Sequence, residues 1–176
     1  MREGGWWDIV SFKWWKVGES GGRLTARMLF SGSHHLSIDE KGRLAVPARF
    51  RQHLSERCGG QLVVTRGPDP DCLVMYPMPE FERLADDIEN MVDRVDAERA
   101  KAITIGFAAD TEMDKQGRIL IPPNLRKIAK LEGPAVLMGQ IRRFDLWAAN
   151  EYEARFGNGS TLFGESAHEA FRTLKR

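Results

Sequence analysis

The chain has 176 residues, of which 42% are hydrophobic and 29% charged, and its formal net charge is +1. This length allows one compact domain or two small ones, and the composition is that of an ordinary globular protein. The near-zero net charge excludes a uniformly basic protein, so a nucleic-acid surface would require local clusters of basic residues. No apolar run is long enough for a membrane span or a signal peptide, which predicts a cytoplasmic protein.

The first 27 residues form an extension with no periodic apolar pattern and little turn chemistry, and we expect residues 1–27 to be unstructured. Their Trp and Phe residues leave open a helix that lies on a membrane surface. We favour no membrane contact, because the pattern is not amphipathic.

The strongest signal is an internal repeat. Residues 36–54 (LSIDEKGRLAVPARFRQHL) and 111–129 (TEMDKQGRILIPPNLRKIA) match without a gap at a constant offset of 75. The identical pairs are Asp39 and Asp114, Gly42 and Gly117, Arg43 and Arg118, Pro47 and Pro122, and Arg51 and Arg126. The sequence therefore predicts two tandem units, at 33–79 and 108–151, joined by a linker region at 80–107 and followed by a C-terminal tail at 152–176.

Each unit is predicted to be a β-hairpin followed by a helix. Asp39 can accept hydrogen bonds from the amides of a tight turn, and Gly42 supplies a positive φ at little cost. Pro47 suits the first turn of a helix, where its missing N–H is no loss. An apolar strand pair follows each helix: Leu62–Thr65 with Leu73–Tyr76, and Ala135–Met138 with Phe144–Trp147.

The linker is predicted to be one amphipathic helix over Pro79–Lys101, with apolar residues at helical spacing. It holds eight acids and four bases, whereas residues 34–66 hold six bases and three acids, and residues 111–145 hold seven bases and four acids. This separation indicates either an ordinary solvated helix face or an acidic surface kept away from DNA.

The two turns carry the candidate DNA-binding residues. Arginine offers a rigid fork of donors that fits a phosphate or the O6/N7 edge of guanine. We therefore expect Arg43 and Arg118 to contact DNA, with Lys41 and Lys115 binding phosphates and Arg49 and Arg51 contributing less. Asp39, Gly42, Asp114 and Gly117 are expected to shape the turns. The alternative for each turn is that the Asp and the Arg four residues later only pair with each other.

The motif D-x-K/Q-G-R followed by an apolar residue, P-x-x, an apolar residue and R resembles the SpoVT/AbrB swapped-hairpin domain. Its tandem arrangement, with GQLVVTRGPDPDCLVMYPMPEFERL after the first copy, resembles the MraZ family of transcriptional regulators. The resemblance implies a mainly β, α+β fold in which two units form an intramolecular swapped-hairpin barrel. It also implies a homo-oligomeric ring, and a repressor in the nucleoid that binds double-stranded promoter DNA at TGGG-type direct repeats before its own cell-division and cell-wall gene cluster.

The genetic code connects the extension to this expectation. Trp has the single codon TGG and Asp codons begin with GA, so Trp6-Trp7-Asp8 is encoded by TGGTGGGAY. Val17-Gly18 and Lys13-Trp14 give GTGGG and GTGG if their first codons are GTG and AAG. These boxes are spaced by about 21 and about 10 nucleotides, close to two turns and one turn of B-DNA. We expect the DNA that encodes residues 1–27 to be the operator, and we expect translation to start at Met28.

A second hypothesis is a protein-interaction module of the antitoxin type, which would use a long C-terminal tail to wrap a toxin. An enzyme is not expected: Asp39-Glu40 has no accompanying nucleophile motif. His34-His35, Cys58 and Cys72 lack the spacing of metal ligands, so no metal, cofactor or small-molecule substrate is expected.

Overall fold

The computed structural model describes residues 29–157. The extension at 1–27 and most of the C-terminal tail lie outside the described residues. The expectation that the DNA encoding residues 1–27 is the operator concerns this undescribed part. Among the helices that are described, none is long and apolar enough to cross a membrane.

Strands from the two repeats are mixed within both sheets. The first repeat supplies β1 (Ser33–Ser37), β2 (Arg43–Ala45), β3 (Gln61–Arg66) and β4 (Cys72–Pro77), and the second supplies β5 (Ala109–Glu112), β6 (Arg118–Leu120), β7 (Pro134–Gln140) and β8 (Arg143–Ala148). The larger sheet has the order β1-β7-β8-β4-β3-β5, and the smaller pairs β2 with β6. All of these pairings are antiparallel.

The predicted strand pairs that follow each helix, β3 with β4 and β7 with β8, are confirmed. The two turns also form, since Gly42 N–H donates to Asp39 O at 2.8 Å and Gly117 N–H to Asp114 O at 2.8 Å. However, β2 does not form a ladder with β1. It pairs with β6 of the other repeat, and β1 pairs with β7. The two repeats are therefore strand-swapped within one chain.

The expected closed barrel is not seen in residues 29–157. The six-stranded sheet is open, with β1 and β5 at its edges, and the β2–β6 ribbon forms a separate sheet. An isolated bridge between Ile38 and Leu44 joins the end of β1 to β2, but it does not extend into a ladder. Since β2 and β6 form ladders only with each other, the fold is mixed α+β with two antiparallel sheets.

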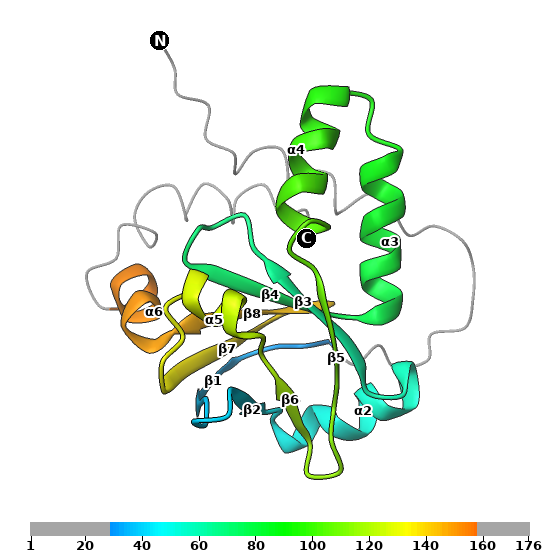
Figure 1. Cartoon of the computed structure of the whole chain (residues 1–176). Helices are drawn as coiled ribbons and strands as arrows, with labels where there is room; N and C mark the ends of the chain where they lie inside the picture. The colour runs from blue at the N-terminus through cyan, green and yellow to red at the C-terminus, as the bar shows by residue number, and fades with distance from the viewer. Residues whose placement is uncertain (1–28, 158–176) are drawn as a thin grey trace, which may run out of the picture.

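The linker region is another correction. The structure has two helices, α3 (Met78–Glu89) and α4 (Arg94–Thr104), in place of one. The side chain of Asp93 caps α4 by accepting from the N–H groups of Val95 and Asp96. An aspartate in this role favours a helix start, which explains the break. Figure 1 shows both helices at the end of the molecule away from the β5–β6 turn.

The main core lies between the six-stranded sheet and the ribbon with its two helices, α2 (Ala48–Cys58) and α5 (Pro123–Ile128). Phe50 of α2 is fully buried, and its ring lies 5.5 Å from that of Phe30 and 5.1 Å from that of Phe144. Leu44 and Ile119, which pair across the ribbon, are buried in the same core. One core is thus shared by both repeats.

A second cluster covers the opposite face of the sheet. There Cys72, Val74, Tyr76 and Trp147 meet α3 and the last helix, α6 (Ala149–Phe156). Burial on both faces explains why every residue of β4 is buried instead of alternating.

Candidate nucleic-acid interface

The two turns between Asp39 and Arg43 and between Asp114 and Arg118 have the same geometry. Asp39 Oδ1 accepts from the N–H groups of Lys41 and Arg43 at 3.0 and 2.9 Å. Asp114 Oδ1 accepts from the N–H groups of Gln116 and Arg118 at 2.9 Å in both cases. Because each carboxylate satisfies two amides of its own turn, the Asp-to-Gly spacing is enough to build the loop.

Each turn aspartate also holds its arginine. Asp39 Oδ2 lies 2.8 Å from Arg43 Nε and 2.7 Å from Nη2, and Asp114 Oδ2 lies 2.9 and 2.7 Å from the same atoms of Arg118. Both arginine side chains remain 31% exposed. The ion pair that was considered as an alternative to DNA binding is present. It fixes one edge of each guanidinium while leaving the side chain accessible.

The ribbon places both arginines on one face. Arg43 pairs with Leu120, and Ala45 pairs with Arg118. Directly opposed residues share a face of a sheet, as do residues two apart on a strand. Arg43 and Arg118 are therefore diagonal neighbours on the outward face, with Cα atoms roughly 7–8 Å apart for this register. Leu44 and Ile119 point to the core.

Leu120 on this outward face was missed by the sequence reasoning. It lies opposite Arg43 and is 50% exposed, although it is a large apolar residue. A signal was available, because Ile119, Leu120 and Ile121 are three consecutive apolar residues where an alternating strand should have a polar one in the middle.

The other predicted basic residues lie in different surroundings. Lys41 and Lys115 are exposed at the tips of the turns. At the offset of 75, Lys115 corresponds to Glu40 and Lys41 to Gln116, so the two tips differ in charge. Arg49 of α2 donates to Ser31 Oγ at 3.1 Å and covers the ring of Phe50 at 4.5 Å. Arg51 donates from Nε to the carbonyl of Val46 at 2.8 Å and is half-buried.

The pKa values of Asp39 and Asp114 are lowered, chiefly by the side-chain hydrogen bonds from Arg43 and Arg118 and then by the backbone N–H groups of the same arginines. A carboxylate with a lowered folded-state pKa stabilises the fold above its unfolded-state pKa of about 3.9, and this contribution disappears as the pH falls through the folded-state value. We expect both turns to be intact at neutral pH and to loosen only in acid.

An NMR titration of the two carboxyl groups should give pKa values below the ordinary range. The variant Asp39→Asn should remove one of these titrations and leave that of Asp114. An ordinary value near 3.9 for both groups would contradict the arginine pairing.

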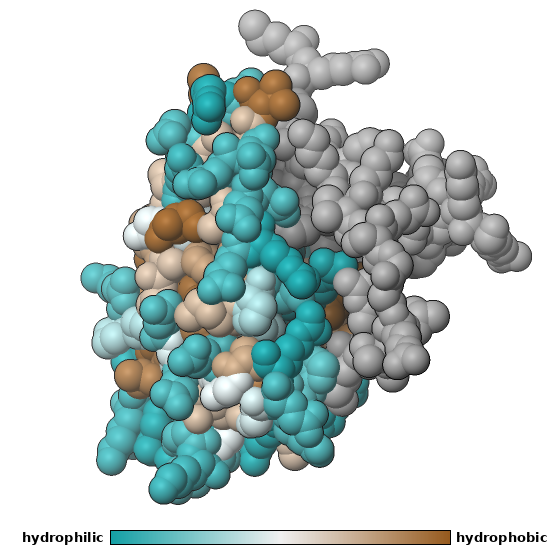
Figure 2. All heavy atoms as spheres, turned by 90° about the vertical axis from the view of Figure 1, so that its right-hand side faces the viewer, coloured by the Kyte–Doolittle hydropathy of each residue, from teal (hydrophilic) through white to brown (hydrophobic). Residues whose placement is uncertain are grey.

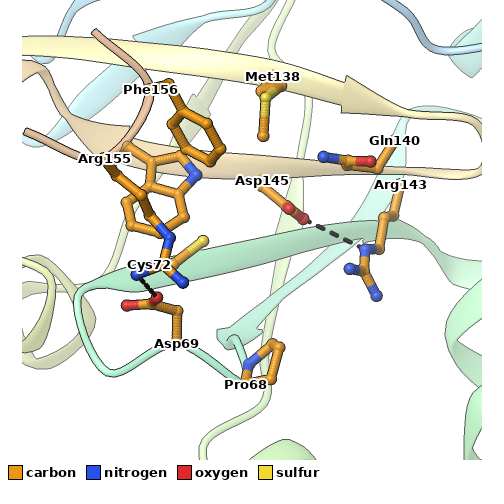
Figure 3. Close-up of a pocket in the computed structure, with 10 residues that line it drawn as sticks. Pro68, Asp69, Cys72, Met138, Gln140, Arg143, Asp145, Arg155 and Phe156 are labelled. Atoms are coloured by element: carbon orange, nitrogen blue, oxygen red, sulfur yellow. Dashed lines mark ion pairs between the residues drawn. The ribbon is translucent and has the colours of Figure 1, made fainter. Parts of the chain in front are cut away.

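A hollow of about 360 Å³ lies on the face of the six-stranded sheet that carries the second cluster. Figure 3 shows Asp145 and Arg143 paired on its wall, at 3.2 Å, and Asp69 near Arg155, at 2.6 Å. Burial raises the pKa of the Asp145 carboxyl and raises that of the Cys72 thiol well above its usual value. Burial and a raised pKa both make a thiol less reactive, so Cys72 is not an activated nucleophile.

The fold and the two turns define a class of protein: two strand-swapped repeats that present paired β-turns with basic residues. Comparisons with known proteins agree. Residues 29–103 and 105–172 each match the family described as "MraZ protein, putative antitoxin-like". The transcriptional regulator MraZ of Pseudomonas aeruginosa strain PAO1 is 42% identical over 127 residues, which are 72% of this chain and 84% of that protein. The transcriptional regulator MraZ of Pseudomonas putida strain KT2440 is 41% identical over the same length.

The chain belongs to the MraZ family of transcriptional regulators, and it contains two MraZ repeats. The resemblance that the sequence motifs indicated is confirmed, as is the expectation that the protein is a regulator and not an enzyme.

Proposed function

We propose that this protein is a sequence-specific DNA-binding repressor of its own cell-division and cell-wall gene cluster, acting on the nucleoid in the cytoplasm. The observation that carries the proposal is the outward face of the β2–β6 ribbon, where Arg43 and Arg118 are diagonal neighbours held by matching turns. A two-stranded ribbon fits the major groove of B-DNA. An arginine that is already oriented by a carboxylate loses less entropy when it binds a guanine edge.

The proposed operator is an array of TGGG-type direct repeats. Guanine O6 and N7 are the usual acceptors for arginine in the major groove, and a run of guanines offers them on successive bases. Lys41 and Lys115 would add phosphate contacts at the edges of the ribbon. The DNA that encodes residues 1–27 is a ready candidate, because TGGTGGGAY contains a box of this type whichever codon is used for Asp8.

The direct test is a gel shift on this encoding DNA and on a duplex in which every TGG of the boxes is changed to TAG. We expect wild-type protein to bind the first duplex and to bind the second only as weakly as random DNA. Equal affinity for both duplexes would contradict sequence-specific recognition. Sequencing the gene is a cheaper check on the phasing, because codons other than GTG for Val17 and AAG for Lys13 would remove two of the three boxes.

Leu120 is proposed to contact the methyl group of the thymine in the box, because it is an exposed apolar residue beside Arg43. Apolar side chains in the major groove recognise the thymine methyl. We expect replacement of that thymine by uracil, which removes only the methyl, to weaken binding by wild-type protein about three- to tenfold, a part of the usual cost of a wrong base. The variant Leu120→Ala should show the same weakening and no further response to uracil. A full response to uracil in the variant would place the contact elsewhere.

We propose that the protein assembles into a homo-oligomeric ring. Trp147 is buried in the second cluster, and Phe81, Met91, Tyr152 and Phe156 pack against it while remaining partly exposed. Other apolar residues are exposed: Val92 at 91%, Val95 at 59% and Ile141 at 60%. Figure 2 shows several apolar spots among hydrophilic residues on the side that carries α3 and α4.

We expect light scattering at micromolar concentration to give a mass several times the 19.9 kDa of one chain. A ring would bind several boxes at once and gain affinity from effective concentration. A monomer under these conditions would contradict the ring. The double variant Val92→Ser/Val95→Ser should reduce the mass if α3 and α4 form the subunit contact.

A protein-interaction module of the antitoxin type remains the second candidate, because the family description includes that likeness. It differs from the first in its prediction for DNA. A module of this kind that acts only through proteins would show no preference between the two duplexes of the gel shift.

A further inference from the structure

Each turn is covered by an arginine that comes from the other repeat. A Cβ atom added at Gly42 would lie 2.8 Å from Cζ of Arg126, which belongs to α5 of the second repeat. A Cβ atom at Gly117 would overlap the guanidinium of Arg51, which belongs to α2 of the first repeat. Such distances are shorter than any normal contact of a Cβ, so only glycine allows the arginine to pack on the turn. Both glycines also have positive φ, +80° and +77°.

Equivalent hydrogen bonds connect each turn to the arginine that covers it. The carbonyl of Gly42 accepts from Ile121 N–H at 2.9 Å, and the carbonyl of Ile121 accepts from Arg126 Nε at 3.2 Å, while Arg126 lies on Gly42. At the turn of the second repeat, the carbonyl of Gly117 accepts from Val46 N–H at 2.9 Å, and the carbonyl of Val46 accepts from Arg51 Nε at 2.8 Å.

We propose that Arg126 and Arg51 are positioning residues that act crosswise: Arg126 fixes the turn that carries Arg43, and Arg51 fixes the turn that carries Arg118. The proposal rests on the proposed DNA binding for its functional meaning, but its structural part can be tested without DNA. It also replaces the expected role of Arg51 as a phosphate ligand and adds Arg126, which the sequence reasoning did not select.

The physical reason is that three residues of β2 and three of β6 are a short ladder, which by itself would leave the tips free to twist. A guanidinium packed on the turn glycine, with its Nε held by a backbone carbonyl, ties each tip to the start of a helix. The two tips then keep a fixed separation, as reading one groove with two arginines requires. Each repeat orients its own arginine through its aspartate, and because the ties cross, it depends on the other repeat to hold the tip in place.

Amide hydrogen exchange of the free protein provides the first test. Arg126→Ala should speed exchange at Gly42 and Arg43 by on the order of tenfold, as expected for local opening, and should leave Gly117 unchanged. Arg51→Ala should do the reverse. Lys127→Ala, an exposed neighbour on the same helix as Arg126, is the matched control and should change neither turn. Faster exchange at the turn of the same repeat, or no change at either turn, would overturn the proposal.

Double-mutant cycles on operator DNA provide the second test. Arg43→Ala should cost about twofold or less in an Arg126→Ala background, and Arg118→Ala should keep its full effect there. In an Arg51→Ala background the two results should be exchanged. Additive effects in both combinations would show that Arg51 and Arg126 contact DNA independently, which contradicts a positioning role.

If Arg126→Ala does not fold, Arg126→Lys serves in its place, because lysine keeps the charge but lacks the flat guanidinium. The lysine variant should give the same crosswise pattern, and wild-type exchange at Gly42 in this variant would overturn the proposal. If the exchange is crosswise but the protein binds no operator, the positioning contacts stand and only the proposed DNA binding is lost.

Discussion

Truncation of Arg43 or Arg118 to alanine is expected to weaken operator binding by about 1–3 kcal/mol each, or roughly five- to 150-fold, as for the loss of one bidentate contact to guanine. Both side chains project from the outward face of the ribbon, and a carboxylate already orients each one. A gel shift or fluorescence anisotropy titration at fixed, moderate salt measures the change. Salt must be fixed because phosphate contacts make affinity strongly dependent on it.

Comparison of a lysine variant with the alanine variant distinguishes the loss of a bidentate contact to a base from the loss of a positive charge. Arg118→Lys keeps the positive charge but cannot present two parallel donors, so it should lose most of the affinity that Arg118→Ala loses. The thermal midpoint should change little in either variant, because an ion pair at the surface contributes little to stability. Normal binding together with a clearly lower midpoint would mean that the arginine serves only the ion pair with Asp114.

Phe50→Ala is expected to lower the free energy of unfolding by about 3–5 kcal/mol, as is usual for a large aromatic residue removed from a core. Phe50 is fully buried and its ring contacts Phe30 of the first repeat and Phe144 of the second. Because the side chain belongs to a core that both repeats share, the loss should destabilise both together. Urea unfolding at one fixed protein concentration measures it, since assembly would otherwise change the apparent stability.

Gln52→Ala is the control on the same helix. Gln52 is exposed and hydrogen-bonds only Glu56 among the described residues, so the change should stay within about 0.5 kcal/mol. Probes placed in the two repeats should report a single transition for Phe50→Ala. Two separate transitions would contradict the shared core, because they would mean that each repeat folds alone.

The sequence by itself determined the repeat, the turns and the residues at their tips. An Asp at the first position and a Gly at the fourth are enough to fix a turn, because the carboxylate satisfies the turn amides and glycine adopts positive φ without strain. Pro47 and Pro122 similarly mark where α2 and α5 start, and the apolar runs of β3, β4, β7 and β8 identify strand pairs. All of these are local relations between residues close in the chain.

The tertiary structure decided every feature that depends on how the strands pair. A three-residue strand such as β2 can pair with any antiparallel neighbour, so its sequence does not select β6 over β1. The open six-stranded sheet, the exposure of Leu120 and the placement of Arg43 beside Arg118 follow from that pairing. The contacts of Arg51 with Gly117 and of Arg126 with Gly42 follow from it too. In sequence these arginines are identical repeat positions, and only the swap of strands brings each one onto the turn of the other repeat.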